Sequence, residues 1–524
     1  MRHFTVLMLC AFWLHLTDFQ APAHAEDYPK SGGTIILGRA ADSTYLDPAK
    51  FLDNESAMVI ENIFDGLVRY ADHSTLIEPA LAVSWERSQN ELEWLFHLRS
   101  GVVFHDGSPF NAEAVAFSFL RKIDPAHPHF REEFRDMDTA WHIVQGVDKV
   151  DEHTVRITLS RPFAPFLDLL ARHSSYIVSP AAVNKWGDEF HRQPVGTGPF
   201  IFQEWNAGTR IILRRNDMYW QGAPYLERVV FKVMPNNKDR LLALKTGTIQ
   251  CMDGINPDDV GEINRRNDLR LDQVTGLNVG YLAMNTASPP WDRLEVRQAL
   301  NHAVNKQALV KLLFRDMAEA AKNPIPPTMW GYNEEIRQYD YDPDKARRML
   351  AEIGLEEGLS TTLWTMPVAR PYLPDPKSAA LAIQANLAAV GIKAEIVTYD
   401  WPEYLAKLYN GEHDLALLGW IGTGDPDNFF FNLFDARNAL PPRASNIAFF
   451  RNDRAQALIA LARETMDQTQ RAEYYRQLQE VIHDNAPWVP LAYAHQVLAR
   501  HEDARDIIYH PTGIHRYYRA WLKK

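Results

Sequence analysis

The sequence predicts an α/β protein organised in about three domains. Stretches with the apolar period of an amphipathic helix alternate with short stretches in which every second residue is apolar, which indicates helices interleaved with strands. Apolar residues make up 46% of the 524 residues and charged residues 23%, the composition of a packed globular chain. At roughly 150 residues per domain, this length corresponds to more than one folded unit.

The first residues are typical of an export signal. Arg2 precedes an apolar run over 4–14, and an Ala-His-Ala sequence ending at Ala25 follows it. We therefore predict a secretory signal peptide over 1–25, cleaved after Ala25. The apolar run is too short to cross a bilayer, which takes about 20 residues.

The two cysteines of the chain cannot form a disulfide framework. Cys10 lies within the predicted signal peptide, so we expect Cys251 to be the only cysteine of the mature protein. Lipidation of Cys10 is a disfavoured alternative, because bulky Leu7, Met8 and Leu9 precede it where a lipoprotein site has a small residue.

Three short segments have the pattern of strands. Residues 34–37 form an apolar run between glycines, which predicts a strand. Apolar side chains alternate over 92–98 and again over 155–159, which predicts two strands with one buried face each.

The clearest helix is predicted over 292–314. Asp292 and Glu295 have the spacing of a capping box, and an apolar stripe follows at the helical period. A second helix is followed at once by a strand over 392–398, because Gly391 ends the helical pattern. The other predicted helices cover 111–120, 377–390 and 468–484.

The segment 195–200 is a glycine-rich turn that enters a strand. A phosphate-binding loop would have the G-x-x-x-x-G-K-[ST] pattern, and no lysine follows here. We therefore expect Gly196 and Gly198 to serve a tight backbone geometry.

Sequence motifs of catalysis are absent. The chain contains no H-E-x-x-H, G-x-S-x-G, G-x-G-x-x-G or Cys-x-x-Cys. His127 and His129 lie in a proline-containing loop, so we favour an exposed loop over a metal site. Asp425 and Asp427 flank a proline, so we favour a turn over an acid–base pair. We predict no cofactor, no metal and no enzymatic activity, with an exported hydrolase of dispersed catalytic residues as the alternative. The net charge of −12 argues against nucleic acid as a partner.

Several motifs in sequence order resemble the family of extracytoplasmic solute-binding proteins that serve peptide and nickel ABC importers. The resemblance runs from about residue 33 to the C-terminus. The general family motifs are at 79–85, 94–101, 104–107, 111–115, 196–200, 296–300 and 303–306. The segments that resemble its dipeptide-binding members are at 326–332, 363–372, 396–401, 411–413 and 424–430.

The resemblance implies a two-lobed periplasmic-binding-protein fold, with mixed sheets, flanking helices, a hinge between the lobes and an extra domain. The implied lobe I combines 26–58, 195–273 and 492–524. The extra domain would cover 59–194 and lobe II 274–491.

The resemblance also implies a function without bond making or breaking. Such a protein captures dipeptides, short peptides or peptide-like solutes in the periplasm and delivers them to a permease in the inner membrane, and it is expected to be a monomer. A ligand carboxylate that loses water in the cleft needs a compensating charge, and the planar fork of arginine suits it. Arg370 is at the position of the family's carboxylate-binding arginine. Tyr372, Trp401 and Trp420 are candidates for lining the pocket, although aromatic side chains also fill cores.

The loop over 419–427 departs from the peptide-binding pattern. The relatives have an aspartate there that binds the ligand ammonium, three residues before the acid-proline pair, and this chain has Gly422. Asp425 is the candidate substitute. An ammonium buried without a carboxylate would cost several kcal/mol. This departure leaves several ligands open: a blocked or modified peptide, a nickel chelate, haem, glutathione or a sugar. Another acid elsewhere in the chain could also bind the ammonium. A sensing role in place of import is a further alternative.

Overall fold

The computed structural model describes residues 28–51, 53–136 and 139–523. The signal peptide predicted over 1–25, its cleavage after Ala25 and the alternative at Cys10 lie outside the described residues. Within the described part, no helix combines the length and the apolar character needed to cross a membrane.

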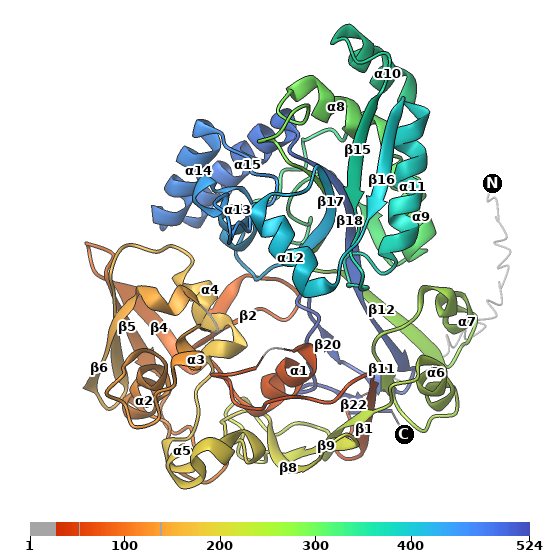
Figure 1. The fold of residues 1–524 in the computed structure, drawn as a ribbon. Coiled ribbons are helices and arrows are strands. Elements are labelled where there is room, and N and C mark those ends of the chain that lie inside the picture. Colours follow the sequence, from red (N-terminus) through yellow and green to blue (C-terminus); the bar gives the residue numbers. More distant parts are fainter. Residues whose placement is uncertain (1–27, 52, 137–138, 524) are drawn as a thin grey trace, which may run out of the picture.

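A 12-stranded sheet runs through the molecule, and strand β18 (Trp488–His501) connects its two halves (Figure 1). In lobe I, β1 (Thr34–Arg39) pairs in parallel with β10 (Arg228–Val233) and β11 (Cys251–Met252). In lobe II, β15 (Leu359–Trp364) pairs in parallel with β16 (Ile392–Val397) and β17 (Leu415–Ile421). The other ladders of this sheet are antiparallel, so the sheet is mixed, as predicted. Lobe I contains β1 (Thr34–Arg39), β8 (Phe200–Asn206), β9 (Arg210–Arg215), β10 (Arg228–Val233), β11 (Cys251–Met252) and β12 (Leu269–Thr275). Lobe II contains β13 (Asn278–Met284), β14 (Ala318–Ala320), β15 (Leu359–Trp364), β16 (Ile392–Val397) and β17 (Leu415–Ile421).

Helices cover the sheets of both lobes (Figure 1). Those of lobe I are α1 (Asn54–Ile63), α6 (Asn237–Lys245) and α7 (Val260–Asn264), and its C-terminal part adds β19 (Ala504–Arg505), β20 (Ile508–Tyr509), β21 (His515–Arg516) and β22 (Trp521–Leu522). Those of lobe II are α8 (Leu294–Ala303), α9 (Lys306–Phe314), α10 (Pro343–Glu352), α11 (Pro376–Ala389), α12 (Trp401–Asn410), α13 (Asp427–Phe434), α14 (Asp453–Glu464) and α15 (Gln468–Asn485).

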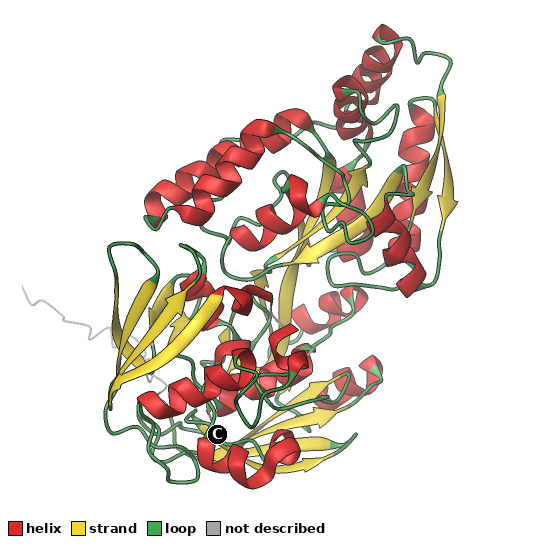
Figure 2. Cartoon of the chain, turned by 60° about the vertical axis from the view of Figure 1, so that its left-hand side comes forward, coloured by secondary structure: helices red, strands yellow, loops and turns green. Residues whose placement is uncertain are grey.

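The extra domain is a four-stranded antiparallel sheet with its own apolar core, set beside both lobes (Figure 2). The alternation predicted over 92–98 is observed, because Trp94, Phe96 and Leu98 are buried on one face of the sheet. The strands are β4 (Ala82–Arg87), β5 (Glu93–Leu98), β7 (Thr154–Leu159) and β6 (Val144–Asp151), accompanied by the hairpin β2 (Val68–Tyr70) and β3 (Ile77–Pro79). The helices are α2 (Ala112–Ile123), α3 (Glu132–Asp136), α4 (Phe166–Ala171) and α5 (Pro180–Trp186).

The prediction of one continuous helix over 292–314 is wrong. Two helices occupy this range, because the chain is extended at Val304 and the Asn305 side chain accepts a hydrogen bond from Ala308 N and so starts a new helix, α9. The predicted capping box is also wrong: α8 begins after Arg293, and no side chain caps it. The helix before Gly391 and the strand after it are observed as α11 and β16.

Gly196 and Gly198 serve a close approach of two backbone segments, as predicted. A Cβ atom on Gly196 would lie 2.3 Å from the Ile63 carbonyl oxygen at the end of α1, and one on Gly198 would lie 2.6 Å from the Ile63 carbonyl carbon. Only glycine allows this contact, which fixes the start of lobe I strand β8 against α1.

The buried apolar residues form one main cluster in the extra domain, one in lobe II and two in lobe I, and the larger lobe I cluster also contains Tyr176, Val183 and Phe190 from the range predicted for the extra domain. The boundary predicted after residue 58 falls inside α1, and the one before residue 492 falls inside β18. Both elements are continuous, so α1 crosses the predicted limit between lobe I and the extra domain, and β18 crosses the one between the two lobes. The domain limits themselves stay a prediction.

Candidate ligand-binding cleft

Two cavities lie where the lobes meet, and Asn54 at the start of α1 lines both. The first, which we call the hinge cavity, has a volume of about 370 Å³ and is lined by Glu55, Asp253 and His515 of lobe I, by Pro371 and Pro374 of lobe II, and by His495 and Gln496 of β18. The second, the junction cavity, has a volume of about 410 Å³ and brings Ala57 of lobe I, Tyr70 and His173 of the extra domain, and Gly422 and Thr423 of lobe II together. Both volumes are in the range of small-ligand sites.

Arg370 lies in a tight turn between β15 and α11. Its backbone N–H donates to the Leu373 carbonyl oxygen at 3.1 Å, and the Leu373 N–H donates back at 2.9 Å. The guanidinium lies 4.6 Å from the centre of the Trp401 ring. Among the residues that the structure describes, no carboxylate forms an ion pair with it. Arg370 directly precedes Pro371, which lines the hinge cavity, whereas Arg370 itself is not part of the lining.

Tyr372 of the same turn is buried in the core of lobe II. Its ring occupies the space above Gly419, where a Cβ atom would lie 2.2 Å from Tyr372 Cδ2. Its hydroxyl lies 4.0 Å from Met366 Sδ, and burial raises the pKa of Tyr372 to about 12. Tyr372 therefore lines neither cavity and anchors the turn that carries Arg370.

The two candidate tryptophans are half-buried at the edge of the lobe II core. Trp401 is the first residue of α12 and stacks on Tyr404 at a ring distance of 5.8 Å. Trp420 lies near the end of β17, and its Nε1 donates to Asn428 Oδ1 at 2.8 Å. Neither tryptophan lines the hinge cavity or the junction cavity. Trp401 contacts the Arg370 guanidinium.

Asp425 and Asp427 form the turn that the sequence predicts, and both carboxylates are in addition buried in ion pairs. Asp425 accepts two hydrogen bonds from Arg471, at 2.9 and 2.8 Å, and Asp427 pairs with Arg463 at 3.1 Å. A turn is present as well, since Asp427 N donates to Asp425 Oδ1 at 2.9 Å. The carboxylate of Asp425 is therefore neutralised within lobe II.

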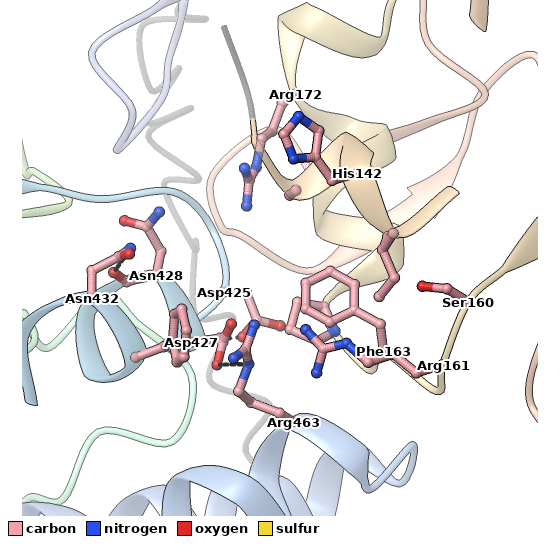
Figure 3. Close-up of a pocket in the computed structure, with 14 residues that line it drawn as sticks. His142, Ser160, Arg161, Phe163, Arg172, Asp425, Asp427, Asn428, Asn432 and Arg463 are labelled. Atoms are coloured by element: carbon pink, nitrogen blue, oxygen red, sulfur yellow. Dashed lines mark hydrogen bonds and ion pairs between the residues drawn. The ribbon is translucent and has the colours of Figure 1, made fainter. Parts of the chain in front are cut away.

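These acids line a third cavity of about 330 Å³ between the extra domain and lobe II, shown in Figure 3. In that view Arg463 contacts Asp427 on the lobe II side, and Arg161 and Phe163 project from the extra domain. The two units are tied here by the Ala164 N–H, which donates to the Arg463 carbonyl oxygen at 2.9 Å. Burial raises the pKa of Asp427 to about 6, although Arg463 opposes the shift.

Gly422 has no room for a side chain. A Cβ atom there would lie 2.1 Å from Phe429 Cε2, inside the van der Waals radius of the ring. The neighbouring Thr423 hydroxyl donates to Asp168 of the extra domain at 3.1 Å, and the Asp168 carboxylate also accepts from Tyr70 and Arg172. The loop therefore packs against two neighbours in place of presenting an acid to the cleft.

Sequence reasoning missed three polar residues on the lobe I wall of the hinge cavity: Glu55, Asp253 and His515. Asp253 directly follows β11, which runs parallel to β1. Ligands of α/β sheets bind beyond the carboxyl ends of parallel strands, so an Asp-Gly pair after a short buried strand was the available signal. Burial is the main cause that raises the pKa of Asp253 to about 7, and Glu55 adds to it while Arg240 and Arg39 oppose it.

Within the described residues, no group of three or more His, Cys, Asp or Glu side chains is arranged to hold a metal ion. In the proline-containing loop, His129 Nε2 forms a hydrogen bond of 2.8 Å with Asn184 Oδ1, and the His127 ring packs on Phe117. Cys251 is buried, and burial raises the pKa of its thiol far above the ordinary value.

Residues 77–440 match the family model described as bacterial extracellular solute-binding proteins, family 5 Middle. The chain is 38% identical over 473 residues to the dipeptide-binding protein of Escherichia coli, which covers 87% of this chain and 88% of that protein. It is 35% identical to heme-binding protein A of Haemophilus influenzae, over 95% of this chain and 94% of that protein. The solved structure of HbpA2 from Haemophilus parasuis superposes with a TM-score of 0.90 at 32% identity, covering 94% of this chain and all of that chain (100%).

Proposed function

Because the chain belongs to family 5 of the bacterial extracellular solute-binding proteins, we propose that it is the periplasmic receptor of an ABC importer for short peptides or peptide-like solutes. The mature monomer, cleaved after Ala25, captures its ligand between the two lobes and delivers it to a permease in the inner membrane. It binds and releases the ligand without making or breaking a bond. The name of the dipeptide-binding relative from Escherichia coli supports the ligand class.

The observation that carries this proposal is the Arg370 guanidinium, which has no ion-pair partner among the described residues and belongs to the turn whose Pro371 and Pro374 line the hinge cavity. A ligand carboxylate that enters the cleft loses water, and a bidentate arginine returns two charge-assisted hydrogen bonds. Tyr372 anchors the turn and Trp401 supports the guanidinium face, so the cation is held ready before the ligand arrives. Trp420 and Asp425 contribute by ordering the loop over 419–427, through Asn428 and Arg471.

A second candidate function is binding of an acidic solute that has no free amine near this loop. Gly422 favours it, because Phe429 occupies the space that an ammonium-binding side chain would need. N-blocked peptides, glutathione, haem, nickel chelates and sugars are the ligands of this second class. The likeness to heme-binding protein A supports the haem case.

The test is calorimetric titration of protein that has been unfolded, stripped of carried-over ligand and refolded. A panel of alanyl dipeptides is titrated together with the N-acetylated form of each. Tight binding of at least one free dipeptide, at one per chain and with the peptide recovered intact, supports the peptide receptor. Binding of only the acetylated forms supports the second class. If neither form gives binding heat, the peptide proposal is contradicted.

The matched variants are Arg370→Ala and, as control, Arg337→Ala, an exposed arginine on the same lobe. Loss of the charge-assisted bonds should weaken binding of a free-carboxylate ligand roughly 10- to 100-fold in the first variant. The control should keep the affinity of the unmodified protein. Equal affinity of both variants would remove Arg370 from the site.

A further inference from the structure

We propose that lobe I holds the cationic end of the ligand through Asp253 and Glu55 in the hinge cavity. This inference rests on the proposed function and deepens it, since it names the group of the ligand that this wall recognises. The ligand is then a small zwitterion, with its carboxylate on lobe II and its ammonium on lobe I. Its binding draws the two lobes together, because each lobe holds one of its charges.

The first support is the placement of the two acids. Glu55 is in the first turn of α1 and Asp253 follows β11, and both line the same cavity of about 370 Å³. The opposite wall consists of Pro371 and Pro374, which belong to the turn that carries Arg370. A ligand in the cavity therefore meets the two acids of lobe I and the lobe II turn that carries Arg370.

The second support is that neither carboxylate has a side-chain partner among the described residues. Among the residues that the structure describes, no hydrogen bond from another side chain and no ion pair reaches Asp253 or Glu55. The nearby arginines bond to groups other than these carboxylates: Arg39 pairs with Asp42 at 3.0 Å and donates to the Glu55 carbonyl oxygen at 2.8 Å, and Arg240 donates to the Pro235 and Gly254 carbonyl oxygens at 3.0 and 3.1 Å. Both arginines act on Asp253 through their charge only. Besides burial, the charge of Glu55 raises the pKa of Asp253, so the two acids repel, and a bound cation would relieve this repulsion.

The third support comes from His515, which lines the same cavity and is only 2% exposed. Both of its ring nitrogens lack a hydrogen-bond partner, whereas buried polar groups are normally paired. Burial lowers its pKa to about 3, so the imidazole is neutral and offers one donor and one acceptor. The ring packs on Tyr509 at a centre-to-centre distance of 4.9 Å, which fixes its orientation in the wall.

The test compares Asp253→Asn, Glu55→Gln and the double variant with Glu227→Gln, which removes an exposed acid elsewhere on lobe I. Each protein is titrated at pH 8 with a free dipeptide that the unmodified protein binds and with its N-acetylated form. We expect the double variant to lose roughly 30-fold or more in affinity for the free dipeptide and to bind the acetylated form as the unmodified protein does. Glu227→Gln should bind both forms normally.

Unchanged affinity of the double variant for the free dipeptide would overturn the inference and leave the proposed function intact. An equal loss for the free and acetylated forms would also overturn it, since a structural role would then explain the effect. If the unmodified protein binds no free dipeptide, the peptide proposal fails first and this inference fails with it. The Arg370→Ala variant separates the two ends of the ligand, because it should weaken the free and acetylated forms alike.

Discussion

Arg471 of α15 holds Asp425 through two parallel hydrogen bonds of 2.9 and 2.8 Å, and both side chains are buried. The guanidinium also lies 5.0 Å from the centre of the Trp330 ring, whose Nε1 donates to the Gly424 carbonyl oxygen at 3.1 Å. The acid in the loop over 419–427 is thus part of the framework of lobe II. A ligand ammonium at this acid would compete with an arginine that is already in place.

Asp425→Ala should therefore destabilise the protein more than it changes ligand binding. Removal of one partner leaves the Arg471 charge buried and uncompensated, which costs about 3–5 kcal/mol of unfolding free energy. Urea denaturation followed by tryptophan fluorescence measures this change. Asp344→Ala, which breaks an exposed pair with Arg347, should cost less than about 1 kcal/mol.

The companion variant Asp425→Ala with Arg471→Met removes both charges and should regain part of the lost stability. A normal unfolding midpoint for Asp425→Ala, combined with weaker binding of a free dipeptide, would instead make Asp425 the ammonium ligand.

Gly422→Asp, which introduces the acid of the peptide-binding relatives, should not restore an ammonium site. Its Cβ atom would lie 2.1 Å from the Phe429 ring, so the loop or the ring must move, at about 1–3 kcal/mol. Thermal unfolding should show a lower midpoint than that of Gly146→Asp, a change at a glycine with open space around it. Tighter dipeptide binding by Gly422→Asp at an unchanged midpoint would contradict this account of the loop.

Trp401→Leu should weaken binding of a free-carboxylate ligand without abolishing it. The indole face supports the Arg370 guanidinium at 4.6 Å, and such a cation–π contact contributes about 0.5–2 kcal/mol. The expected loss in affinity is roughly 3- to 30-fold by calorimetry, and Trp401→Phe should retain most of the binding. Trp186→Leu, at an exposed tryptophan of the extra domain, is the control and should have no effect.

Asp253→Asn should stabilise the ligand-free protein at pH 8 and lose this advantage at pH 4.5. The folded pKa of about 7 lies above the ordinary value, so the folded protein retains a proton that the unfolded chain releases. The wild-type carboxyl therefore costs stability that grows as the pH rises from about 4 through 7. Groups near Asp253 are Glu55 of α1, Arg39 of β1, Arg240 of α6, Tyr509 of β20, His515 of β21 and Tyr517.

The measurement is the difference in thermal midpoint between the variant and the unmodified protein at the two pH values. Contributions from the buried histidines cancel in this difference. Glu227→Gln should show no such trend, and a variant difference independent of pH would contradict the raised pKa of Asp253.

Local sequence patterns predicted some of the elements of lobe II. Helix α11, strand β16 and the turn between them follow from an apolar stripe and Gly391, which has a φ of +88° that favours glycine. The same approach failed at 292–314, because the pattern continues through Asn305 while its side chain starts a second helix. Periodicity reports which face is buried, and it does not detect a cap inside an apolar stripe.

The sequence by itself determined the two-lobed fold, through motifs that match those of a known family. It also determined that Arg370 lies in such a motif and that the loop over 419–427 has Gly422 in place of an acid, because both depend on residues close together in the chain. Only the tertiary structure decided the partners. Arg471 reaches Asp425 across 46 positions, and Phe429 fills the space at Gly422. Glu55, Asp253 and His515 meet in one cavity because β11 pairs beside β1 and the β20–β21 hairpin packs near α1. Their unpaired state and shifted pKa values arise from burial among particular neighbours, a property that no single stretch of sequence contains.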